Sequence, residues 1–170
     1  MISLVSRLAA VLALSLPLAA GAADAQRQAD VAARGAAVMP FDLHATTHFF
    51  TTTGIGGVQR VVARHPDDPV QVGLVRQHLQ EIESRFRKGD FSGPEHIHGA
   101  DMPGLAELRA APPGEISISY REVRGGAELA YRTADPQLVR ALHAWFAAQR
   151  SDHGTDAVDG HRGHPGHSGK

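Results

Sequence analysis

The sequence predicts an α+β fold in which two tandem ββα units form one antiparallel sheet, with two long helices on one face. Two observations predict it. Gly56-Gly57 and Gly125-Gly126 each join two strand-like stretches, and an Asp-Pro pair followed by a long helical pattern comes after each second strand. Because one ββα unit buries its apolar face poorly, we expect the two units to share a core.

Each unit is expected to contain two strands and one helix. In both helices the Asp supplies an N-cap oxygen and the Pro occupies the first helical position, where its missing N–H costs nothing. Both helices also contain a Leu-Val-Arg triplet, at residues 74–76 and 138–140. The expected ranges are strands 43–53 and 58–64 with helix 68–88, then strands 115–123 and 127–133 with helix 135–150.

The first 25 residues have the features of a secretory signal peptide. Arg7 precedes an apolar run over residues 8–20, and small-residue A-x-A sites follow at residues 20–22 and 23–25. The run is too short to cross a membrane, which needs roughly 20 apolar residues. We therefore predict cleavage of residues 1–25, a periplasmic location and no membrane segment in the mature protein.

The rest of the chain is expected to form a single domain with flexible ends. Residues 26–38 are Ala-rich and predict a short helix, residues 39–154 the α+β domain, and residues 155–170 a disordered His- and Gly-rich tail. The formal net charge of -1 and the lack of a basic block argue against nucleic acid as a partner.

Histidine is the most informative residue type in this chain. There are eleven histidines and no cysteine, and imidazole is the commonest metal ligand among side chains. The connector between the two units carries His96, His98 and Met102. In extended backbone His96 and His98 would point to the same side, about 7 Å apart. Since a thioether is a soft ligand that suits Cu(I), His98 and Met102 predict a metal site that favours copper ahead of zinc.

Three further histidines are candidate ligands at this site. His48 lies in the middle of the first strand, and His78 and His143 flank the apolar stripes of the two long helices. The alternative for each is a structural role, in which the ring bonds a backbone carbonyl or a carboxylate. Asp152 is a candidate to orient an imidazole from behind.

The sequence also allows functions other than metal binding. His44-Ala45-Thr46 matches one H-x-T element of two-histidine phosphoesterases, but the second half of the chain has no counterpart. The sequence has no nucleophile elbow, no P-loop, no dinucleotide-binding fingerprint and no H-E-x-x-H motif. An enzyme is therefore not favoured, and a ligand-free interaction module is a further alternative.

Seven stretches of the chain also carry a family resemblance. They are V-M-P-F-D-L (38–43), T-T-H-F-F (46–50), G-G-V-Q-R-V-V-A-R (56–64), G-D-F-S (89–92), I-H-G-A-D-M-P-G-L (97–105), A-L-H-A-W-F (141–146) and S-D-H-G (151–154). Together they resemble a family of small exported bacterial proteins often labelled aspartate carbamoyltransferase. The resemblance implies a transferase as an alternative function. It assigns no catalytic residue, because the Ser-Thr-Arg-Thr phosphate loop of true aspartate carbamoyltransferases is missing from this sequence.

Overall fold

The computed structural model describes the backbone of residues 17–162 and the side chains of residues 21–161. Within this part of the chain the fold is α+β, with one five-stranded mixed sheet and five α-helices, which confirms the predicted class. The strands are β1 (Thr46–Thr53), β2 (Gly56–Ala63), β3 (Ser117–Val123), β4 (Gly126–Arg132) and β5 (Ala157–Asp159). The helices are α1 (Pro17–Val38), α2 (Pro69–Phe86), α3 (Ser92–His98), α4 (Leu105–Ala110) and α5 (Pro136–His153).

The two predicted hairpins, β1–β2 and β3–β4, meet at the centre of the sheet. The spatial order is β3-β4-β2-β1-β5, and β2 pairs antiparallel with β4, where Val61 lies opposite Ala127. The fifth strand lies outside β1 and runs parallel to it, with Ala157 opposite His48. The expectation of a wholly antiparallel sheet is therefore wrong, although its four long strands do pair antiparallel.

Residues 155–162, predicted to belong to a disordered tail, form regular structure. The chain after α5 turns through a 3-10 helix (Gly154–Asp156), forms β5 and continues into a second 3-10 helix (Gly160–Arg162). The physical reason is the edge of β1, whose unpaired N–H and C=O groups accept another strand. The amino-acid composition of residues 155–170 does not indicate that part of this segment pairs with the edge of β1. Residues 163–170 lie outside the described part of the chain.

The long helices begin where the sequence predicts. The Asp68 carboxylate accepts hydrogen bonds from the backbone N–H groups of Val70 and Gln71, and Pro69 opens α2. Asp135 caps α5 in the same way through Gln137 N–H. These caps satisfy amide donors that have no partner inside a helix.

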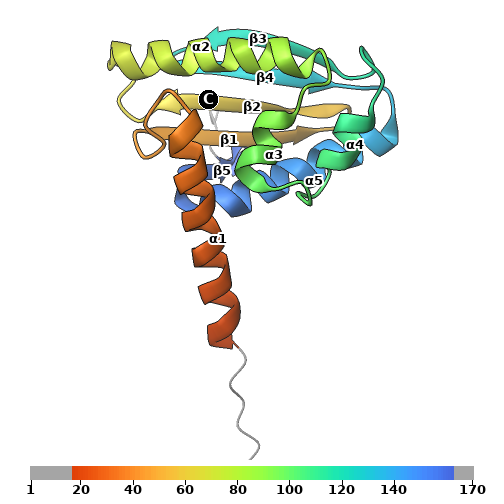
Figure 1. Cartoon of the computed structure of the whole chain (residues 1–170). Helices are drawn as coiled ribbons and strands as arrows, with labels where there is room; N and C mark the ends of the chain where they lie inside the picture. The colour runs from red at the N-terminus through yellow and green to blue at the C-terminus, as the bar shows by residue number, and fades with distance from the viewer. Residues whose placement is uncertain (1–16, 163–170) are drawn as a thin grey trace, which may run out of the picture.

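Both long helices pack on the same face of the sheet. Alternate strand residues such as Phe50, Val61 and Leu129 point into one core, which also contains Leu79 of α2 and Phe146 of α5. Figure 1 shows α3 and α4 beside this layer, in the connector between the two hairpin–helix units. The core is therefore closed by α2 and α5, with the connector covering its end.

The connector is helical where extended backbone was expected. His96 and His98 both belong to α3, and His96 is exposed while His98 is buried. Residues two apart on a helix point in very different directions. The two histidines therefore do not share a side, and the expectation that they do is wrong.

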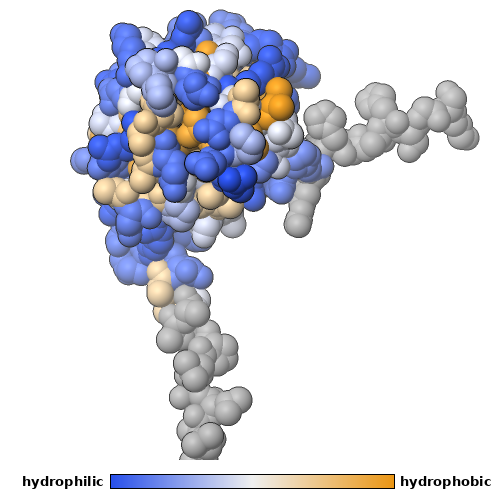
Figure 2. Space-filling view, turned by 90° about the vertical axis from the view of Figure 1, so that its right-hand side faces the viewer, coloured by the Kyte–Doolittle hydropathy of each residue, from blue (hydrophilic) through white to orange (hydrophobic). Residues whose placement is uncertain are grey.

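The N-terminal segment forms a longer helix than predicted. Residues 26–38 are helical as expected, but α1 already begins at Pro17 and so includes the predicted cleavage sites. Residues 1–16 of the predicted signal peptide lie outside the described residues, so cleavage stays a prediction. In the described part, no helix has the length and apolar character needed to cross a membrane. Figure 2 shows that one face of the molecule is mainly hydrophilic, with only small apolar patches.

Candidate functional site

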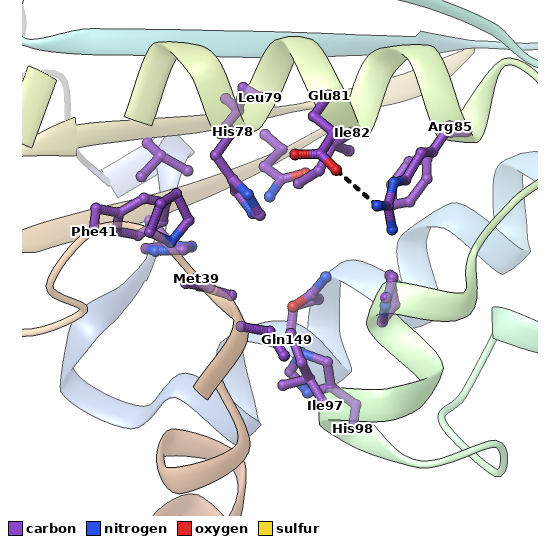
Figure 3. Close-up of a pocket in the computed structure, with 18 of the residues that line it drawn as sticks. Met39, Phe41, His78, Leu79, Glu81, Ile82, Arg85, Ile97, His98 and Gln149 are labelled. Atoms are coloured by element: carbon purple, nitrogen blue, oxygen red, sulfur yellow. Dashed lines mark hydrogen bonds and ion pairs between the residues drawn. The ribbon is translucent and has the colours of Figure 1, made fainter. Parts of the chain in front are cut away.

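A cavity of about 480 Å³ lies between α2, α3, α5 and the first hairpin, and we call it the histidine cavity. Four imidazoles, His48, His78, His98 and His153, border it. Figure 3 shows His78 entering from α2 and His98 from α3 on the opposite side, with Met39 and Gln149 between them. The remaining walls are mostly apolar, formed by Val38, Met39, Pro40, Phe41, Val61, Leu79, Ile82, Phe86, Pro94, Ile97 and Trp145.

His48 is the most deeply buried of the four imidazoles. It is 3% exposed on the helix-facing side of β1, between Thr46 and Phe50. Neither ring nitrogen has a hydrogen-bond partner in the described structure. Burial lowers the pKa of His48 well below its usual value, and the neighbouring imidazoles lower it further. The ring is therefore neutral at neutral pH and has a free lone pair.

His98 is held in one orientation by a carboxylate. Its Nδ1–H donates to Asp152 Oδ2 over 2.8 Å, which leaves the Nε2 lone pair free. Burial lowers the pKa of His98, while the bond to Asp152 opposes that shift. Imidazole bonded from behind by a carboxylate is the usual arrangement of a metal-ligating histidine.

Asp152 is in turn fixed by α1. Arg27 donates from Nε to Asp152 Oδ1 over 2.6 Å and from its terminal nitrogen to Oδ2 over 2.9 Å. Burial would raise the pKa of Asp152, but the hydrogen bonds from Arg27 and His98 outweigh it and lower the pKa. Asp152 thus stays ionised although it is only 3% exposed.

His153 connects His48 and His98. It is the last residue of α5, and its ring stacks on His48 with centroids 4.9 Å apart. Its ring lies edge-on to that of His98 at 5.2 Å. Burial lowers the pKa of His153 to about 4. Gly154, at a φ of 53°, ends the helix directly after this histidine.

Two of the three ring pairs, His153 with His48 and His153 with His98, have the spacing of imidazoles on one metal ion. With Zn–N distances of about 2.0–2.1 Å and tetrahedral angles, the centroids of two bound imidazoles lie about 5 Å apart. The orientations do not yet match, because the rings of His48 and His153 are stacked, at 27°. Among the described residues, no group of three or more His, Asp or Glu side chains is arranged to hold an ion. Since neither nitrogen of the His48 ring has a hydrogen-bond partner in the described structure, turning that ring breaks no hydrogen bond.

The structure separates the predicted ligands into two groups. His48, His78 and His98 meet at the histidine cavity, whereas Met102 and His143 do not border it. Met102 is 2% exposed within the apolar core, where its side chain serves packing. The Nε2–H of His143 donates to the carbonyls of Thr53 and Gly56, both at 3.0 Å. His143 therefore has the structural role that was the alternative for it.

Two cavity residues were not among the predicted ligands. They are His153, the last residue of α5, and Met39, in the segment that follows α1. The signal for His153 was its neighbour Asp152, the predicted orienting carboxylate, which orients His98 instead. No local pattern marks Met39, because it enters the cavity through the packing of α1 and the segment after it.

Comparisons with known proteins found no match to the chain among family models, curated proteins or solved structures. The resemblance to exported proteins labelled aspartate carbamoyltransferase therefore stays a prediction.

Proposed function

We propose that the protein binds a transition-metal ion through His48, His98 and His153. The observation that carries the proposal is that the His153 ring lies between two other imidazoles, with centroids 4.9 Å from His48 and 5.2 Å from His98, and that Asp152 orients His98. A metal also explains why His48 is buried without a partner, since an unsatisfied buried polar group destabilises a fold.

The ligand types favour copper ahead of zinc. The soft ligand in the cavity is Met39, which takes the place expected of Met102. The only acidic side chain on the cavity wall is Glu81, which is paired with Arg85 at 2.7 Å. Imidazole and thioether without carboxylate or thiolate suit Cu(I). His78, across the cavity, is the candidate for a fourth ligand.

Metal titration of matched variants tests the proposal. His161, His164 and His167 are first replaced by Gln, so that the tail contributes no binding, and Cu(I) and Zn²⁺ are then titrated. Replacing His48, His98 or His153 by Gln is expected to lower the affinity about tenfold or more. His143→Gln is the matched control and is expected to leave it unchanged. Retention of less than about a tenth of an equivalent of either metal, with no thermal shift on adding it, contradicts the proposal.

We also propose that the protein works in the periplasm. The signal-peptide features of residues 1–25 support export, and Arg27, which fixes Asp152, lies just after the predicted cleavage sites. Cleavage after Ala25 would keep this contact. Cell fractionation with N-terminal sequencing tests the proposal, and a cytoplasmic protein that keeps residues 1–25 contradicts it.

We further propose that the two hairpin–helix units are an internal repeat. The antiparallel pairing of β2 with β4 and the two Asp-Pro caps support a two-fold relation. His48 and Ile118 occupy corresponding positions, eight residues before the first residue of β2 and of β4. His48, one of the proposed ligands, therefore has no histidine counterpart in the second unit. In an experimental structure the helices should superpose when the hairpins are overlaid, and helices that diverge would exclude a repeat.

A further inference from the structure

The histidine cavity is much larger than a metal ion requires. At about 480 Å³ it lies in the size range of sites for small organic molecules. The three clustered imidazoles occupy one part of its wall, while Met39, Phe41 and Ile82 form an apolar part. We propose that this cavity binds a small uncharged organic molecule that has a flat apolar body and one hydrogen-bond acceptor. The proposal does not depend on the metal.

Hydrogen-bond donors without a partner at the cavity indicate that the ligand carries a hydrogen-bond acceptor. The indole Nε1–H of Trp145 is buried and has no partner in the described structure. Gln59 accepts from the hydroxyl of Tyr131 through Oε1, at 2.9 Å, so its amide N–H₂ remains available. Both residues border the cavity, but the indole nitrogen is covered by neighbouring atoms, so the amide of Gln59 is the donor offered to a ligand and the indole lies behind it. Because buried donors are nearly always paired, a ligand that enters here is expected to bring an oxygen acceptor.

The electrostatics of the wall favour a ligand without charge. Apart from its histidines, the cavity is bordered in the described structure by two charged side chains, Glu81 and Arg85. Glu81 and Arg85 neutralise each other at 2.7 Å. A charged ligand would be buried without a counter-charge, which is strongly unfavourable.

The cavity opens toward solvent between α2 and α3. Glu81 and Arg85 border it with side chains 55% and 51% exposed, and Gly93 at the start of α3 adds no side chain there. Of the lining residues, Ile82 is partly buried and Trp145 is 1% exposed. The walls therefore offer both an entrance and a buried end.

Three probes of similar size and shape differ in the chemistry of one substituent. Acetophenone has a flat ring and a carbonyl acceptor, ethylbenzene lacks the acceptor, and benzoate carries a charge. We titrate each into the full chain after removal of metal with a chelator, and measure binding by calorimetry. Acetophenone is expected to bind, and the other two about tenfold or more weaker. Equal affinity for acetophenone and ethylbenzene, or no acetophenone binding at millimolar concentration, overturns the proposal.

A variant and a spectroscopic signal locate the binding. Ile82→Trp fills the cavity and is expected to weaken acetophenone binding about tenfold, whereas Val70→Trp, on the exposed side of the same helix, leaves it unchanged. Trp145 is the one tryptophan of the chain, so its indole N–H gives one resonance in wild-type protein. Acetophenone should shift this resonance more than ethylbenzene does. An unmoved resonance contradicts the proposal even if Ile82→Trp fails to fold. Because metal is absent throughout, these outcomes leave the metal proposal untouched.

Discussion

Two clusters of ring side chains lie in the same layer, beneath the helix-covered face of the sheet, and they differ in chemistry more than in geometry. Within the first, which we call the imidazole cluster, neighbouring rings have centroids 4.9 and 5.2 Å apart. Within the second, the aromatic cluster, the distances run from 4.3 to 6.5 Å. The imidazole cluster is His48, His98 and His153, and the aromatic cluster is Phe86, Phe91, Tyr131, Trp145 and Phe146.

The rings of the two clusters pack at similar distances, but we expect the two clusters to stabilise the fold to different extents. The aromatic cluster removes large apolar surfaces from water, and the hydroxyl of Tyr131 has a partner in Gln59. In the imidazole cluster both nitrogens of His48 lack a partner and all three rings border the cavity of about 480 Å³. In the aromatic cluster the indole nitrogen of Trp145 also lacks a partner in the described structure, but only Phe86 and Trp145 border that cavity. A cluster that leaves volume empty and nitrogens unpaired is arranged for a ligand, at a cost in stability.

The largest expected effect comes from breaking the aromatic cluster. Trp145→Ala removes a side chain that is 1% exposed and should lower the free energy of unfolding by about 3–5 kcal/mol. Urea denaturation followed by circular dichroism measures the change. The exposed Val70→Ala serves as control. A loss below about 1 kcal/mol would mean that this cluster does not anchor the core.

Acid should act on the imidazole cluster and leave the aromatic one unaffected. The unfolded chain binds a proton on His153 as the pH falls through 6.5, while the folded chain does so only near its lowered pKa of about 4. The unfolded state therefore binds more protons in this window, and the free energy of unfolding decreases as the pH falls, by about 3 kcal/mol for this group.

Urea denaturation at several pH values between 7 and 4.5 measures that slope. His153→Leu is expected to flatten it, whereas His65→Leu, at an exposed position, serves as the control. An equal slope in wild type and His153→Leu would show that His153 does not carry the effect.

The fold was predictable because its signals are local. Gly-Gly turns, Asp-Pro caps and the period of apolar residues give each hairpin and helix directly, and Asp68 and Asp135 make the contacts that such caps make. The parallel strand β5 was not predictable, because a three-residue strand depends on the free edge of β1 rather than on its own composition.

The site was only partly predictable, because it depends on which side of each element faces the cavity. His48 and His78 could be placed from strand and helix periodicity. Met102 and His143 were predicted as ligands of the same site, but Met102 is packed in the apolar core and the first hairpin supplies carbonyls for His143. The contact from Arg27 to Asp152 joins residues 125 positions apart, which no local pattern encodes.

The Arg27 contact gives a prediction of intermediate size. Arg27→Met removes both hydrogen bonds to the buried Asp152, and because Arg27 is 43% exposed we expect a loss of about 1–2 kcal/mol in stability. Asp152 also orients His98, so the metal affinity should fall about tenfold.

Arg34→Met is the matched control. Arg34 lies on the same helix and donates to the carbonyl of Ile97 at 2.6 Å, so it also joins α1 to α3 without touching Asp152. It is expected to lower stability but to leave the metal affinity unchanged. Equal losses of affinity in both variants would mean that docking of α1, rather than orientation of Asp152, sets the site.

The smallest effect has the opposite sign. His48→Leu replaces an imidazole that has no hydrogen-bond partner by an apolar side chain of similar size. Position 48 lies on the same face of β1 as Phe50, which belongs to the core. Removing unsatisfied nitrogens should raise the free energy of unfolding of the metal-free protein by about 1 kcal/mol. With excess Cu(I) wild type should become more stable than His48→Leu, because a ligand that binds only the folded state stabilises it by about 2.7 kcal/mol at a hundredfold excess over Kd.

His143→Leu is the control, and since it breaks two hydrogen bonds to backbone carbonyls it should be less stable than wild type in both conditions. A His48→Leu protein that is less stable than wild type without metal would show that this histidine serves the fold, which would remove the contrast between the two clusters.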